Sequence, residues 1–223
     1  MLQPETSQFL TQLKQNNNKP WFDAHRKLYE TAKTDIVSLL TTVLSGLEQT
    51  DPALATAQLV AKSCLFRINR DVRFSANKAP YKTCFGAWFA VGGKKSPAAG
   101  YYVHLEPGGS FVAGGVYAPE PAILTTIRQE IDYNLPAFEA LLADPVFQKN
   151  YTGLATDNAL VNAPKGYRPD NPALPYLRLK SFTASYALPD SLLRSPKLAP
   201  TAVSALAALQ PLVAFLNRAL LPG

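Results

Sequence analysis

Apolar side chains recur every three or four positions in the first quarter of the chain. They begin at positions 9–13, where this spacing predicts a short amphipathic helix. Three asparagines at 16–18 then favour a turn and a helix cap. The helical spacing resumes directly afterwards. Because proline suits the first helical position, we expect a second, unbroken helix from Pro20 to about Glu48.

The period changes to that of a strand near residue 64. Apolar and polar side chains alternate over 64–69, which predicts a strand with one polar face. Pro80 and several small polar residues oppose regular structure, so we expect a loop over 74–82. A second strand is predicted over 83–91.

A hairpin is predicted near the centre of the chain. Apolar runs at 101–105 and 110–116 flank the sequence Glu106-Pro107-Gly108-Gly109, which is typical of a tight turn. Because a short turn of this kind joins neighbouring antiparallel strands, we expect the sheet to be mostly antiparallel.

The second half of the chain is predicted to be mainly helical. Prolines open two expected helices, over 119–133 and 136–149. A late strand is predicted over 177–186. A final helix is expected from Pro200, and Pro211 is expected to kink or restart it.

The composition fits a compact protein without a membrane span. Of 223 residues, 47% are hydrophobic and 17% charged, which is ordinary for a globular chain. Since no linker or repeat divides the sequence, we predict a single α+β domain over residues 1–223, with a mostly antiparallel sheet packed with several helices. No stretch approaches the ~20 apolar residues of a membrane helix, and the N-terminus lacks the pattern of a signal peptide. A cytoplasmic location is therefore expected.

Histidines and cysteines are too few and too widely spaced for a structural zinc site. The chain contains Cys64, Cys84, His25 and His104, without any paired-ligand spacing. We expect both thiols to be reduced, buried and structural, and we predict neither a metal nor another cofactor. His25 belongs to a helical stripe and His104 to a strand, and both are interpreted as packed, hydrogen-bonded side chains. The sequence patterns of phosphate-binding loops and nucleophile elbows do not occur.

Positive charge is concentrated in one segment. The formal net charge of the chain is +6, yet residues 61–100 contain eight basic side chains and one acidic side chain. Residues 101–163, in contrast, contain two basic and seven acidic side chains. The basic segment would attract phosphate, carboxylate or nucleic acid if its side chains converge on one surface. Otherwise it is a set of solvated lysines and paired arginines.

The basic segment contains a distinctive arginine–aspartate motif that ends at Tyr81. Its charged and polar members are Arg67, Arg70, Asp71, Arg73, Asn77 and Lys78. A carboxylate between two guanidiniums reduces their repulsion and fixes their planes through bidentate contacts. Because nearby cations favour the ionised carboxylate, we expect the pKa of Asp71 to be lowered. We therefore assign Asp71 as an organiser of the arginines and not as a general base.

The pattern R-x-x-R-D-x-R-F-x-x-[DN]-K-x-x-Y is complete between Arg67 and Tyr81. It resembles the mainly bacterial domain-of-unknown-function 2461 family. The resemblance extends nearly from end to end, and it includes the runs at 16–22 and 164–167. It implies no established reaction, and it directs attention to the residues of the motif.

The function favoured by these observations is the binding of a small anionic ligand that carries phosphate or carboxylate. The candidate ligand-binding residues are Arg67, Arg70, Asp71, Arg73, Asn77, Lys78, Tyr81 and Lys165. Lys165 is included because the adjacent Gly166 lets the backbone approach a ligand closely. Whether any reaction is catalysed stays open, and no catalytic residue is assigned.

Two alternatives stay open. The first is nucleic-acid binding, for which Phe74, Tyr81, Tyr101 and Tyr102 are candidate stacking residues. The acidic segment that follows the motif argues against it. The second alternative is a structural or interaction protein, in which the arginine–aspartate motif clamps a loop onto the sheet.

Overall fold

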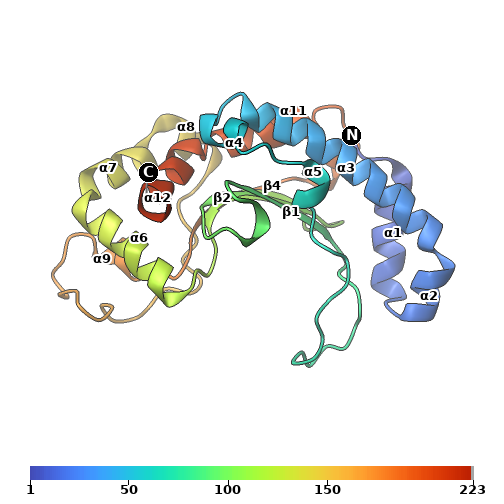
Figure 1. Ribbon diagram of the computed structural model, residues 1–223, viewed down its shortest axis with the longest axis horizontal. Helices are drawn as coiled ribbons and strands as arrows, with labels where there is room; N and C mark the ends of the chain where they lie inside the picture. Colours follow the sequence, from blue (N-terminus) through green and yellow to red (C-terminus); the bar gives the residue numbers. More distant parts are fainter. Residues whose placement is uncertain (222–223) are drawn as a thin grey trace.

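The computed structural model describes residues 1–221 and shows the predicted α+β architecture (Figure 1). Its antiparallel sheet has the strand order β1-β2-β3-β4. The strands are β1 (Phe85–Ala90), β2 (Gly100–Leu105), β3 (Phe111–Val116) and β4 (Phe182–Ala187). The predicted hairpin is confirmed as β2 and β3, whose register pairs Tyr102 with Ala113.

The helices of the N-terminal half pack mainly through the long helix α3, which contacts α1 and the edge strand β1. They are α1 (Pro4–Gln15), α2 (Lys19–Ala24), α3 (Arg26–Glu48), α4 (Pro52–Thr56) and α5 (Ala61–Cys64). The predicted first helix is confirmed. The expected unbroken helix from Pro20 to Glu48 is wrong, because the chain leaves helical geometry at His25. There the Nδ1 atom of His25 lies 2.8 Å from the Trp21 carbonyl oxygen, and the two rings stack 4.2 Å apart.

The C-terminal half forms a second helical group. Its elements are α6 (Pro121–Tyr133), α7 (Leu135–Ala143), α8 (Pro145–Asn150), α9 (Leu174–Leu177), α10 (Asp190–Leu193), α11 (Leu198–Ala207) and α12 (Gln210–Leu220). The 3₁₀ turn η1 (Gly93–Lys95) lies between β1 and β2 and contacts β1 and α5. The kink predicted near Pro211 is confirmed, since α11 and α12 meet at 50°. Within residues 1–221, no single helix is long and apolar enough to cross a membrane.

Two sequence-based expectations fail in this half for local reasons. The helix expected over 136–149 is divided, because Asp144 caps α8 by accepting hydrogen bonds from the backbone N–H groups of Val146 and Phe147. The late strand begins only at Phe182, because the residues up to Leu177 form the short helix α9.

Helices cover one face of the sheet and leave the other face open (Figure 1). Side chains alternate between the two faces along each strand. On the covered face, Tyr101, Val103 and Phe89 are buried beneath helices that include α3 and α11. On the opposite face, Trp88, Tyr102 and His104 are only half-buried. We call this second surface the open face.

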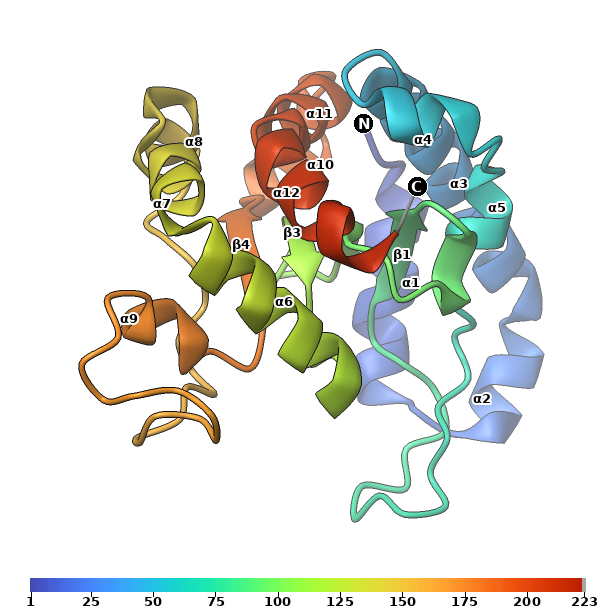
Figure 2. The ribbon, with the colours of Figure 1, turned by 60° about the vertical axis from the view of Figure 1, so that its left-hand side comes forward.

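The strand predicted over 64–69 is not formed. Cys64 ends α5, and the following residues make only isolated bridges, Leu65 with Ala87 and Asn69 with Tyr81. Pro80 lies in the opposing segment and lacks an N–H donor, so a regular ladder does not develop there. The loop expected over 74–82 is confirmed. Residues 66–84, which we call the arm, project from the open-face side of the sheet (Figures 1 and 2).

Candidate functional site

The base of the arm is fixed to the turn between α1 and α2. The Asn17 side chain donates to the Tyr81 carbonyl oxygen at 2.9 Å and accepts from the Tyr81 N–H at 3.0 Å. The Tyr81 ring is buried and stacks on Phe22, with 4.0 Å between centroids and 14° between planes. Tyr81 therefore anchors the arm, and its ring is not accessible to a ligand.

Arg70 acts inside the arm. Its guanidinium donates to the Ala79 carbonyl oxygen at 3.0 Å and to the Ser75 hydroxyl at 3.3 Å. The backbone N–H of Arg70 also donates to the Pro80 carbonyl oxygen. These bonds join the two halves of the arm, which is the contribution of a structural clamp.

Lys78 and Asn77 shape the tip of the arm. The ammonium group of Lys78 donates to the carbonyl oxygen of Val72 at 3.1 Å, and the Asn77 side chain accepts from the N–H of Ala79 at 2.9 Å. Both side chains are exposed, so Lys78 can still offer its remaining N–H donors to a ligand.

Asp71 forms a two-point ion pair with Arg73. Its oxygens accept from Nε of Arg73 at 3.0 Å and from Nη2 at 2.7 Å. These hydrogen bonds hold the pKa of Asp71 below its usual value, with a smaller contribution from Arg67. The lowered pKa agrees with the organiser role. Asp71 orients Arg73 alone, however, because Arg70 points into the arm.

The structure brings all the motif residues together in the arm and places Lys165 elsewhere. Arg67, Arg73 and Lys78 are exposed along the arm. Lys165 lies in the loop between α8 and α9, which projects from the same side of the sheet at some distance from the arm (Figures 1 and 2).

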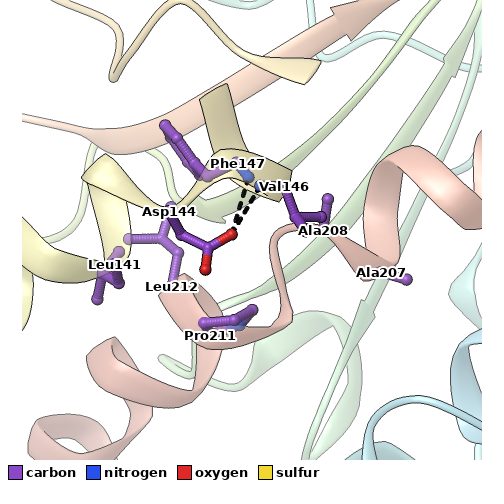
Figure 3. Close-up of a pocket in the computed structure, with 8 residues that line it drawn as sticks. All are labelled: Leu141, Asp144, Val146, Phe147, Ala207, Ala208, Pro211 and Leu212. Carbon is purple, nitrogen blue, oxygen red and sulfur yellow. Dashed lines mark hydrogen bonds between the residues drawn. The ribbon is translucent and has the colours of Figure 1, made fainter. Parts of the chain in front are cut away.

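Neither of the two described hollows is lined by arm residues. One, of about 220 Å³, lies between α7, α8 and the α11–α12 junction (Figure 3). It is mainly apolar, and its carboxylate, Asp144, is already used to cap α8 (Figure 3). The other is a shallow depression on α3 that includes Glu30 and Asp35. The candidate anion site of the arm is therefore an open surface.

The open face holds a hydrogen-bonded group of polar side chains that the sequence did not predict as a group, although Tyr102 is a candidate stacking residue. The Tyr102 hydroxyl lies 3.1 Å from Nδ1 of His104, and Nε2 of His104 lies 3.3 Å from a carboxylate oxygen of Glu106. With its proton on Nε2, His104 donates to Glu106 and accepts from Tyr102. The second Glu106 oxygen accepts from the Thr83 hydroxyl at 3.0 Å. The alternation of Tyr102, His104 and Glu106 in a strand was the available signal.

Burial and neighbouring charge act on the ionisable groups of this face. Burial raises the pKa of Tyr102 to about 12, and the nearby Cys84 thiol contributes in the same direction. Burial also raises the pKa of Cys84, and the Glu106 carboxylate adds to this. Both groups are therefore neutral at physiological pH. The two thiols are free, as expected, although Cys84 is only half-buried.

The four candidate stacking residues differ in their burial and in their position in the fold. Tyr81 and Tyr101 are buried, which removes them as stacking partners for a ligand. Phe74 is 97% exposed and lies near the end of the arm. Tyr102 alone lies on the open face of the sheet.

The comparisons with known proteins identify a family and no function. No curated protein and no solved structure matches the chain. A family model described as "Conserved hypothetical protein (DUF2461)" matches residues 5–215, which is nearly the whole chain. The match agrees with the resemblance seen at the arginine–aspartate motif. The chain belongs to the DUF2461 family.

Proposed function

We propose that the protein binds an anionic ligand, bearing phosphate or carboxylate groups, at the exposed surface of the arm. The observation that carries the proposal is that the cations of the motif have two different roles. Arg70 is used to hold the arm together, whereas Arg67, Arg73 and Lys78 face solvent. Their charge is balanced within residues 61–100 by Asp71 alone.

The arm supports such binding because its backbone is held in place before a ligand arrives. The Asn17–Tyr81 hydrogen bonds fix the base, and the Arg70 and Lys78 bonds fix the two halves. A preorganised set of donors loses less conformational entropy on binding than a flexible one. The proposal also includes Lys165, which is a cation in the loop between α8 and α9. A cytoplasmic location is part of the same proposal, and the free thiols agree with a reducing compartment.

The test is calorimetric titration with inorganic tripolyphosphate and with citrate at low salt. Arg67→Ala is the informative variant, because Arg67 is exposed, and its loss is expected to weaken binding at least about fivefold. Lys27→Ala is the matched control, since Lys27 is an exposed cation on α3. Affinity should also fall as salt rises.

Two results would count against an anion site on the arm. One is the absence of binding to either probe by the wild-type protein at low salt. The other is equal weakening by Arg67→Ala and Lys27→Ala, which would indicate a general charge effect. In both cases the motif would be left with the structural role shown by Arg70.

A further inference from the structure

Four aromatic side chains form a continuous row across the open face. Phe66 lies 6.4 Å from Tyr102, which lies 5.8 Å from Phe111, measured between ring centroids. His104 lies 5.9 Å from Tyr102 and stacks on Phe111 at 4.7 Å with 16° between planes. All four residues are half-buried, in contrast to the fully buried aromatic residues of the covered face. Trp88 is the direct cross-strand partner of Tyr102 and extends the aromatic surface.

The Tyr102 ring leans along the sheet. A Cβ atom built on Gly86 of the neighbouring strand would lie 2.6 Å from the Tyr102 hydroxyl oxygen and 3.2 Å from its ring. The phenol therefore occupies the space that a side chain at Gly86 would fill. The hydrogen bond to His104 holds it there. A ring in this position presents a flat surface for stacking.

Cations flank the aromatic row. The ammonium groups of Lys82 and Lys94 lie 5.3 Å and 5.7 Å from the centroid of the Phe66 ring. The acid on this side, Glu106, is paired with Lys14 at 3.8 Å and with His104. The arm and the Lys165 loop project on either side of the open face (Figures 1 and 2). The face is thus aromatic at its centre and cationic at its Phe66 end, next to the arm.

Single-stranded nucleic acid matches this surface. Its bases stack on aromatic side chains irrespective of sequence, and its phosphates pair with flanking lysines and arginines. Bases of a duplex are already stacked on one another and would not reach the rings.

We propose that the open face binds single-stranded nucleic acid, with bases stacked on Tyr102 and Phe111 and phosphates paired with Lys82 and Arg67. This inference rests on the proposed anion site of the arm, since it assigns the anion to a nucleic-acid backbone. It adds a base-binding surface that the arginine–aspartate motif does not contain.

The experiment is fluorescence anisotropy with a labelled ten-nucleotide oligothymidylate, followed over a range of salt concentrations. Tyr102→Leu and Phe111→Leu keep apolar bulk and remove the aromatic ring. Each is expected to weaken binding about tenfold without changing the salt dependence. Lys82→Ala should instead reduce the log–log salt slope by about one. Tyr133→Leu is the control, because this exposed tyrosine lies on α6.

A second measurement reports directly on the open face. Trp21→Phe leaves Trp88 as the remaining tryptophan, and its fluorescence should change when the oligonucleotide binds. Trp21→Phe also serves if a leucine variant is unfolded by circular dichroism, because it leaves the open face intact. An oligonucleotide that binds without altering Trp88 emission would overturn the proposal.

The outcomes separate this inference from the anion site. Tripolyphosphate binding without oligonucleotide binding would retain the anion site and refute the base-binding surface. The same refutation would follow if thymidine monophosphate competed with the oligonucleotide at equal concentration, since one nucleotide would then suffice. Oligonucleotide binding that is lost in Tyr102→Leu but unaffected by Arg67→Ala would retain the open face and refute the arm.

Discussion

The two faces of the sheet use the same residue type in different ways. Tyr101 and Tyr102 are neighbours in β2, and strand alternation sends them to opposite faces. Tyr101 is 1% exposed, and its hydroxyl donates to the buried Asp51 carboxylate at 2.7 Å. Tyr102 is half-buried and bonds to His104. The layer of helices over one face of the sheet, and not the residue type, therefore decides which tyrosine is buried and which is partly accessible.

The largest difference is expected for the aromatic pair Phe89 and Trp88. Phe89→Ala should lower the free energy of unfolding by about 3–5 kcal/mol, because Phe89 is fully buried beneath the helices. Trp88→Ala, on the open face, should cost less than half of that. Urea unfolding measures both. Equal losses would mean that the open face is as well covered in solution as the helical face.

Removing each tyrosine hydroxyl should give a smaller contrast. Tyr101→Phe leaves a buried carboxylate oxygen of Asp51 without its phenol donor, and should cost about 1–3 kcal/mol of unfolding free energy. Tyr102→Phe should cost under about 1 kcal/mol, since water reaches this side chain. Chemical denaturation under the same conditions compares them. The reverse order would contradict the assignment of the two faces.

Alkaline pH should distinguish the open face further. The pKa of Tyr102 is raised to about 12, so the folded state favours the neutral phenol. The resulting stability is present below pH 10 and is lost as the pH rises toward 12. The loss should be less steep in Tyr102→Phe. The difference in tyrosinate absorbance near 295 nm between the wild type and Tyr102→Phe follows the titration of this group. A midpoint near pH 10 would contradict the partial burial of Tyr102.

The smallest effect is expected at the exposed ion pair of the arm. Asp71→Asn removes an exposed, solvent-screened ion pair and should leave the free energy of unfolding nearly unchanged. Asn17→Ala, at the base, removes two hydrogen bonds and should cost about 1–2 kcal/mol. Thermal unfolding compares the two variants. A large loss in Asp71→Asn would place the ion pair in the structural framework.

Regular elements could be predicted from the sequence where a local signal was sufficient. The turn at Glu106–Gly109 fixed the hairpin, and Pro211 marked the kink between the last two helices. The break at His25 could not be predicted from periodicity, because Phe22 and Tyr29 stay on one side, with 5.1 Å between their ring centroids, despite it. At Asp144-Pro145 the signal was present, since aspartate and proline together typically begin a helix.

The two candidate sites also differ in how far a local sequence signal could reveal them. The motif could be found because its residues are close in sequence, but the inward direction of Arg70 depends on Ser75 and Ala79 in an irregular loop. The row on the open face joins Phe66, Tyr102 and Phe111 from three segments. Its recognition requires the strand register and the knowledge of which face the helices cover.

The Asn17–Tyr81 contact links the ordering of the arm to the folding of the N-terminal helices. It joins residues 64 positions apart, so the chain loses loop-closure entropy before the two hydrogen bonds form. We therefore expect the base of the arm to become fixed only when the α1–α2 turn docks. The arm's contacts at its tip are local and solvent-exposed, and segments of this kind open without global unfolding. In native-state hydrogen exchange, the arm amides should exchange through a low-energy opening, while those of β2 exchange only when the whole protein unfolds.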